Sequence, residues 1–176
     1  ANLENMDISG TGSNRITLTG NTVNNTLTGN DANNIITGGL GNDTIFGGAG
    51  NDTLFGGAGN DVMTGGDGAD TFVFDTALNA TTNVDLISDF SPGGDTLTLD
   101  KTIFTKLTTI GTLNSSLFCA SASGAAMDAN DYILYNTTTG ALFYDADGSG
   151  VGASIQFATL TNKPANLSAT DFIVVA

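Results

Sequence analysis

Four aspartates spaced nine residues apart are the side chains of this chain best suited to chemistry. They are Asp43, Asp52, Asp61 and Asp70, and each ends a six-residue turn that holds three glycines. Glycine tolerates positive φ angles, so successive carbonyl oxygens in such a turn can converge beside the carboxylate. A pliable cage of roughly six to eight oxygens suits Ca²⁺ better than Mg²⁺. The absence of histidine and the presence of a single cysteine argue against Zn²⁺ or Cu²⁺.

The same nine-residue period predicts the architecture that must position these aspartates. Residues 38–73 hold four consecutive copies of the form G-G-x-G-x-D-x-apolar-x. Such a period is typical of a parallel β-helix, in which each repeat is a turn followed by a short strand. We expect three residues around the apolar place to form the strand and the other six to form the turn. The apolar places are Ile45, Leu54, Met63 and Phe72.

These repeats resemble the RTX (repeats-in-toxin) family of secreted bacterial proteins, whose nonapeptides form a calcium-loaded, right-handed parallel β-roll. The resemblance implies that turns eighteen residues apart stack on one edge and share an ion, giving at least two Ca²⁺ sites. The first would use the carboxylates of Asp43 and Asp61 and the carbonyls of Gly38, Leu40, Gly57 and Gly59. The second would use the carboxylates of Asp52 and Asp70 and the carbonyls of Gly47, Ala49, Gly66 and Gly68.

The repeat continues backwards in degenerate form through residues 11–37. The apolar place is kept as Leu18, Leu27 and Ile36, but the aspartate is replaced by Asn25 and Asn34. We therefore expect the roll to continue while calcium binding fades. The side-chain carbonyl of Asn34 could join Asp52 in a weaker third site, or its amide could form a hydrogen-bonded ladder or a turn without metal. For Asn25 we expect no metal.

The sequence predicts an all-β protein with two regions. Residues 1–73 are expected to form the roll, and residues 74–176 a β-rich C-terminal region that caps its open end and carries a secretion signal. For residues 100–130 helix and strand both remain possible. Asp75, Asp89 or Asp95 could close a last calcium site against Asp61, or could be ordinary turn residues. The expected strands are Phe72–Phe74, Asp85–Phe90, Asp95–Leu99, a hairpin of Asp131–Tyr135 and Ala141–Tyr144, Ser154–Leu160 and Asp171–Ala176.

A second oxygen-rich loop follows the expected hairpin. Asp145, Asp147 and Ser149, with Gly150 next, are spaced like the first half of an EF-hand calcium loop. The closing glutamate of that motif is missing, and Gln156 stands in its place. The loop could therefore bind calcium through Asp145 and Asp147 or could be a tight turn between two strands.

Composition excludes several classes of partner. The chain has 18 acidic and four basic residues, a net charge of −14, and 17 of the acids are aspartate. Such a surface repels nucleic acid and anionic membranes, so we expect neither as a partner. No apolar run is long enough to span a membrane, and no signal peptide opens the chain. Because the chain begins in the middle of the pattern, we expect it to be the C-terminal part of a longer protein.

The last residues indicate a route of export. Asp171 followed by a short apolar tail to Ala176 resembles the end of the uncleaved type I secretion signal in serralysin-like RTX proteins. The resemblance implies type I secretion machinery as a partner and a secreted, extracellular or cell-surface location. A last strand docked on the cap would give the same pattern, and the two interpretations are compatible.

The favoured function is a calcium-binding RTX module, at the C-terminus of a type I secreted bacterial protein, that folds on extracellular Ca²⁺. We expect no enzyme activity, because the chain lacks histidine, a G-x-S-x-G elbow and an H-E-x-x-H helix. One alternative is an adhesion or ice-binding solenoid, since outward places carry many threonines, although Ile35, Phe46 and Phe55 interrupt the rows. Another is an accessory domain of a secreted protease, lipase or epimerase.

Overall fold

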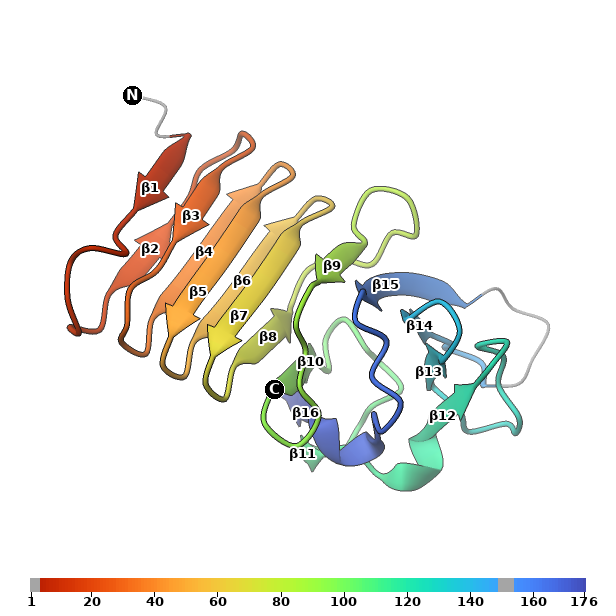
Figure 1. Ribbon diagram of the computed structural model, residues 1–176. Coiled ribbons are helices and arrows are strands. Elements are labelled where there is room, and N and C mark those ends of the chain that lie inside the picture. Colours follow the sequence, from red (N-terminus) through yellow and green to blue (C-terminus); the bar gives the residue numbers. More distant parts are fainter. Residues whose placement is uncertain (1–3, 149–153) are drawn as a thin grey trace.

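The computed structural model describes residues 4–148 and 154–176, and its strands form two sheets that face each other (Figure 1). One sheet has the order β1 (Asn5–Asp7), β3 (Thr26–Thr28), β5 (Thr44–Ala49), β7 (Val62–Asp67), β9 (Asp85–Ile87), β15 (Ile155–Leu160), β14 (Ala141–Tyr144), β13 (Ile133–Asn136) and β12 (Phe118–Ser121). The other has the order β11 (Gly111–Thr112), β16 (Phe172–Val175), β10 (Thr96–Asp100), β8 (Thr71–Phe74), β6 (Thr53–Ala58), β4 (Ile35–Leu40) and β2 (Thr17–Thr19).

Consecutive strands of the first half alternate between the two sheets, which makes this half a parallel β-roll, as the sequence predicts. Each strand pairs in parallel with the strand eighteen residues away, so Ile36 lies beside Leu54 and Ile45 beside Met63. The apolar place of every repeat points between the sheets and is at most 2 % exposed. One inward side chain per repeat therefore forms the apolar core of the roll.

The strands of the roll are longer than the three residues that the sequence predicts. From β4 to β7 each strand has six residues and runs through the two glycines. The reason is that stacked turns also pair as a parallel ladder, with Gly39 opposite Gly57 and Gly48 opposite Gly66. In the degenerate repeats, β2 and β3 keep the expected three residues.

The C-terminal region continues both sheets of the roll. Strand β9 pairs in parallel with β7, and β10 pairs in parallel with β8, so the alternation survives the loss of the nine-residue period. The predicted hairpin is confirmed as the antiparallel pair β13 and β14. Residues 100–130, left open between helix and strand, contain turns, β11, β12 and the short 3₁₀ helix η1 (Ser115–Leu117). A second such helix, η2 (Ala169–Asp171), precedes β16.

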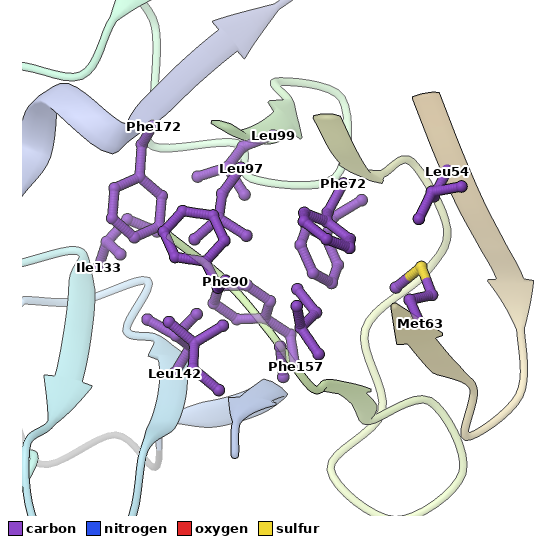
Figure 2. Packing of buried hydrophobic residues seen from close by; sticks show 14 of the residues in the cluster. Leu54, Met63, Phe72, Phe90, Leu97, Leu99, Ile133, Leu142, Phe157 and Phe172 are labelled. Carbon is purple, nitrogen blue, oxygen red and sulfur yellow. The ribbon is translucent and has the colours of Figure 1, made fainter. Parts of the chain in front are cut away.

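One hydrophobic core runs from the roll into the cap (Figure 2). The ring of Phe157 on β15 packs edge-on against Phe74 of β8 at a centroid distance of 5.1 Å. The same ring meets Phe104 of the cap at 5.2 Å. Cys119 is buried and unpaired, as the sequence predicts. Within the described residues, no helix is both long and apolar enough to cross a bilayer.

The continuous core makes the division at residue 73 testable. Phe157 is 1 % exposed and packs against Phe74 of β8, the strand that spans the division, so Phe157→Ala should lower the free energy of unfolding in calcium by about 3–5 kcal/mol. The roll and the cap should still unfold in one transition, followed by circular dichroism and by hydrogen exchange. Phe46→Ala, at a site 40 % exposed, is the control and should change stability by less than about 1 kcal/mol. Two separate transitions would show that the regions fold independently.

Candidate metal centre

The turns between the strands stack so that their aspartates form two buried ladders. In the first, the backbone N–H of Asp43 donates to Oδ1 of Asp61 at 2.7 Å. In the second, the N–H of Asp52 donates to Oδ1 of Asp70 at 2.8 Å. The four side chains are at most 1 % exposed. The structure thus brings together the two aspartate pairs that the sequence predicts.

One carboxylate oxygen of each aspartate has no partner. Oδ2 of Asp43, Asp52, Asp61 and Asp70 is buried and accepts no hydrogen bond. Burying a carboxylate oxygen without a donor costs free energy, because the charge loses its hydration and no hydrogen bond replaces it. In the part of the chain that the structure describes, no lysine or arginine side chain reaches these atoms. The orphaned oxygens therefore need a cation or a proton.

We number the nine positions of the repeat G-G-x-G-x-D-x-apolar-x as places one to nine. The glycine at place one leaves room for these orphaned oxygens. A Cβ built on Gly47 would collide with Oδ2 of Asp52 and with the carbonyl oxygen of Gly65 in the stacked turn. The corresponding Cβ on Gly38 would collide with Oδ2 of Asp43 and the carbonyl oxygen of Gly56. Place one is not in the left-handed region, so its glycine is required for space and not for φ. Carboxylate and carbonyl oxygens thus converge at each of these turns.

The glycines at places two and four have a different role, because they do adopt positive φ. Gly57 has φ +100° and Gly59 has φ +147°. Added side chains there would strike the carbonyls of the turn below, Gly39 and Gly41 respectively. Leu40 at place three is 53 % exposed, so only its backbone could face the ladder. The predicted carbonyl donors all lie in the stacked turns, and their part in binding remains a prediction.

The predicted donor set fits a hard cation that binds oxygen. Among residues 4–148 and 154–176, no place gathers three or more His, Cys, Asp or Glu side chains in a metal-binding group. A metal at these turns would therefore need backbone carbonyls in addition to two carboxylates, as the RTX resemblance implies. Many oxygen ligands in a flexible loop suit Ca²⁺, whereas thiolate- or imidazole-binding metals lack their ligands here.

Burial shifts the protonation of the ladder aspartates. Loss of solvent raises the pKa of Asp61 and of Asp70 to about 6, opposed by the backbone N–H each receives. It raises the pKa of Asp43 and Asp52 in the same direction. Without a cation these groups therefore resist ionisation.

A ladder of asparagines, which the sequence analysis missed, lies beside the aspartate ladder on each edge. We call the asparagine ladder the outer ladder and the aspartate ladder the inner ladder. The N–H of Asn42 donates to Oδ1 of Asn24 at 2.9 Å, and the N–H of Asn60 donates to Oδ1 of Asn42 at 3.0 Å. On the other edge, the N–H of Asn51 donates to Oδ1 of Asn33 at 2.9 Å. Asparagine at place five of five consecutive repeats, from Asn24 to Asn60, was the available signal. These bonds hold the turns eighteen residues apart without involving a metal.

The ladders continue into the cap through residues that differ from those expected. Asp61 is met by Asp85, whose Oδ1 accepts the Asp61 N–H at 3.1 Å, and not by Asp75, Asp89 or Asp95. Asp95 instead accepts the N–H of Asp70 at 2.9 Å. Burial and the charge of Asp61 raise the pKa of Asp85 to about 8.

The sequence held a signal for this continuation. Ile87 follows Asp85 at the same spacing of two that separates aspartate from the apolar place in the repeats, and Leu97 follows Asp95 likewise. A longer loop between β8 and β9 hides the match, because it lengthens the step from Asp61 to Asp85 to twenty-four residues. The correct partner therefore follows from local spacing and not from the period.

The last turn of the roll is closed by backbone donors. Oδ1 and Oδ2 of Asp89 accept the N–H groups of Gly65 and Gly66 at 3.0 and 2.8 Å. Oδ2 of Asp95 accepts the N–H of Ser91 at 2.8 Å. Both oxygens of Asp89 and of Asp95 are thus hydrogen-bonded, unlike those of the ladder aspartates in the roll. These two residues act as a cap on the last turn.

Of the remaining candidates, Asn34 adjoins the Asp52–Asp70 pair, whereas Asp145 and Asp147 lie in the cap. Asn34 is buried below Asp52 and donates its backbone N–H to Oδ1 of Asp52 at 2.7 Å. Asp145 is buried and accepts the N–H of Asp147 at 3.2 Å, which is the bond of a tight turn. Burial raises the pKa of Asp145. Ser149 and Gly150, which complete the predicted EF-hand-like spacing, lie outside the described residues, and metal binding by Asp145 and Asp147 remains a prediction.

Comparison with known proteins supports the fold and the assignment of the repeats. The family profile of the RTX calcium-binding nonapeptide repeat (four copies) matches residues 9–45, 19–54 and 38–72. The solution structure of the AlgE6R2 subunit of the Azotobacter vinelandii mannuronan C5-epimerase is 29 % identical, with a TM-score of 0.52, over 89 % of this chain and 91 % of that one. The AlgE6R3 subunit of the same epimerase is 27 % identical over 97 % and 83 %, with a TM-score of 0.49. Comparison with curated proteins gives no match.

The fold and the site define the class of this protein as a parallel β-roll with oxygen-lined, stacked turns. The repeats of residues 9–72 match the profile of the RTX calcium-binding nonapeptide repeat.

The pKa shifts predict how the calcium-free roll responds to pH. An ordinary aspartate has a pKa of about 3.9, whereas Asp61 and Asp70 in the fold have about 6. The folded state holds the extra protons, so the stabilisation is complete below about pH 4 and is lost as pH rises through about 6. Without calcium the melting temperature should therefore fall from about pH 4 towards neutral pH, as measured by circular dichroism.

Two controls separate this effect from general charge repulsion. High NaCl screens exposed charges but should leave the trend largely in place, because the ladder is buried. Asp61→Asn with Asp70→Asn should flatten it. A melting temperature that rises with pH in calcium-free buffer would contradict the assignment.

Proposed function

We propose that this chain is a calcium-binding RTX module that folds when Ca²⁺ reaches it outside the cell. The single observation that carries the proposal is the set of four buried Oδ2 atoms without partners. Bound Ca²⁺ would supply the positive charge and the coordination that these oxygens lack. The Asp43–Asp61 and Asp52–Asp70 pairs, with the carbonyls of their turns, are the two sites we propose.

The thin core explains why folding would depend on the ion. Each repeat buries one apolar side chain, such as Leu54 or Met63, yet it orders nine residues, three of them glycine in the strong repeats. Ordering a residue costs roughly 1–2 kcal/mol, while burying a Leu or Met contributes roughly 1.5–3 kcal/mol. Extracellular calcium modules work at dissociation constants of about 10⁻⁴–10⁻³ M, well above cytosolic calcium. The roll would then remain unfolded before export.

The C-terminal strand supports export of an unfolded chain. Phe172 and Val174 of β16 are at most 1 % exposed, and β16 lies between β10 and β11. Oδ1 of Asp171 accepts the N–H of Gly93 at 2.8 Å, so the start of this segment is also tied down. A secretion signal at residues 171–176 would be readable only before the cap folds. We therefore propose type I secretion with recognition of the unfolded C-terminus and a secreted or cell-surface location.

A calcium titration followed by far-UV circular dichroism tests the proposed function. The chain should show little order in chelator at neutral pH and a cooperative gain of β signal with Ca²⁺. Asp52→Ala and Asp61→Ala should each lower the free energy of unfolding in excess calcium by roughly 3 kcal/mol, since an ion at a hundredfold its dissociation constant contributes about 2.7 kcal/mol.

Asp67→Ala is the matched control for these variants. Asp67 is exposed at place three, so its loss changes the net charge equally without touching the ladder. It should behave like the original chain. The proposal fails if the spectrum is the same with and without calcium, or if all three variants have the same stability.

We infer a second role, as an accessory module of a secreted polysaccharide-modifying enzyme, from the likeness to a repeat subunit of a mannuronan C5-epimerase. A pocket of about 520 Å³ in the cap gives this role a location. It is lined by Lys106, Tyr132, Asn114 and several threonines, a mixture of cation, aromatic ring and hydroxyl groups that suits an acidic sugar. Backbone N–H of Lys106 donates to the Tyr144 hydroxyl at 2.8 Å, which anchors the loop.

Calorimetry with mannuronate oligomers tests this second role on the calcium-loaded chain. Binding should occur, and Lys106→Ala should weaken it at least about tenfold, the loss expected when one charged contact is removed. Lys101→Ala, which removes the same charge outside the pocket, should leave the affinity unchanged. Absence of binding, or equal binding by both variants, would refute an acidic-sugar site.

A further inference from the structure

Residues 29–34 form the turn directly below Asp52, on the edge of the Asp52–Asp70 pair. This turn differs from the turns stacked above it. In residues 29–34, place two holds Asn30 and place six holds Asn34, where the next turn of the row holds Gly48 and Asp52. Both asparagines are 1 % exposed. Their amide groups therefore lie inside the roll, where each polar atom needs a partner from the protein itself or a bound ion.

The amide nitrogen of Asn34 faces three oxygen atoms. It donates to the carbonyl of Asn30 at 3.3 Å, to the carbonyl of Ala32, and to Oδ1 of Asp52 at 3.3 Å. Two of these acceptors are the carbonyls of places two and four. The nitrogen also lies beside the Cβ position of Gly29, just as Oδ2 of Asp52 lies beside that of Gly47. The nitrogen of Asn34 thus occupies a point on which ligand-type oxygens converge.

Asn30 directs its amide nitrogen to the opposite side of the same turn, towards residues 11–16. Its Oδ1 accepts the N–H of Ala32 at 3.0 Å. Its Nδ2 donates to Oγ1 of Thr11 at 3.1 Å and to the carbonyl of Asn14 at 3.0 Å, both in the preceding turn of this row. That preceding turn carries Ile16 at place six and so has no carboxylate to offer. The Asn30 amide therefore closes the gap between residues 11–16 and 29–34, and the Asn34 amide lies in the next gap, between residues 29–34 and 47–52.

We propose that Asn30 closes the gap to residues 11–16 and Asn34 closes the gap to residues 47–52 without a metal ion, the amide nitrogen of Asn34 taking the place of Ca²⁺ beside Asp52. The inference rests on the proposed calcium sites of the turns above. It assigns Asn34 as the residue at which the stack of ions ends on this edge. The first coils of the roll then hold together by covalently attached donors, and the aspartate turns can stack on them as calcium binds.

The other end of the Asn34 amide defines the competing assignment. Its Oδ1 is buried and has no hydrogen-bond partner, so a rotated amide could present this oxygen to an ion shared with Asp52. In that case the nitrogen would give up its three acceptors. The two assignments therefore differ in whether calcium binding requires Asn34 and in whether the nitrogen keeps its hydrogen bonds.

Two measurements on Asn34→Ala, made in the full chain, separate them. In calcium-free buffer at about pH 5, where protonated aspartates favour the fold, the melting temperature should drop by about 5 °C or more, because the carbonyls of Asn30 and Ala32 lose this side-chain donor. By calorimetry with calcium alone, the number of ions bound should stay unchanged. An unchanged melting temperature, or the loss of one bound ion, would overturn the proposal.

Asn33→Ala is the matched control. Asn33 is exposed, and its Oδ1 accepts the N–H of Asn51 in the asparagine ladder. Its melting temperature should change by less than about 2 °C. If Asn34→Ala does not fold, NMR of the original chain decides. The side-chain N–H protons of Asn34 should exchange slowly with solvent in the calcium-loaded chain and also, at about pH 5, in the calcium-free chain. Rapid exchange in the folded chain would refute the proposal even if no calcium binds at all.

Discussion

A row of buried carboxylate oxygens without donors is the constraint on which this structure depends. Each ladder aspartate uses Oδ1 to hold the turn below and leaves Oδ2 unsatisfied beside the first glycine of its own turn. In an interior of low dielectric constant, such an arrangement is stable only when positive charge or a proton joins it. The glycines, the slim core and the repeat length all follow from keeping these oxygens close together. The turn, more than the strand, is therefore the structural unit of the roll.

The inner ladder of aspartates and the outer ladder of asparagines donate their hydrogen bonds in opposite directions along the stack. Together they fix the register of the turns. In the inner ladder, the N–H of one turn donates upwards to the aspartate of the next, as Asp43 does to Asp61. In the outer ladder, the N–H of the upper turn donates downwards to the asparagine below, as Asn60 does to Asn42. A slip by one repeat would place a strand in the other sheet and break both sets of bonds. The outer ladder is independent of ionisation, whereas the inner ladder carries the charge.

The cap solves the problem of ending a solenoid. It extends both sheets by strands that no longer follow the period, and it places Asp89 and Asp95 where the backbone N–H groups of the last turn would otherwise lack acceptors. The aromatic rings of Phe74, Phe104 and Phe157 widen the core beyond the single side chain per repeat that the roll allows. The C-terminal strand β16 lies inside this cap, so folding of the cap and burial of the C-terminus are one event.

The sequence by itself determined the roll, because a period of nine with one apolar residue and three glycines per repeat allows few other backbones. The resemblance of its repeats to the RTX family also indicated which aspartates share an edge, since that resemblance implies that turns eighteen residues apart stack. Only the tertiary structure decided that Asp85 and Asp95 continue the ladders, because a loop of irregular length separates them from the repeats. It likewise decided how the Asn34 amide is oriented, which depends on carbonyls of its own turn and on Asp52 eighteen residues away. Local spacing encodes the repeating unit, whereas the ends of the stack depend on contacts between segments that no period relates.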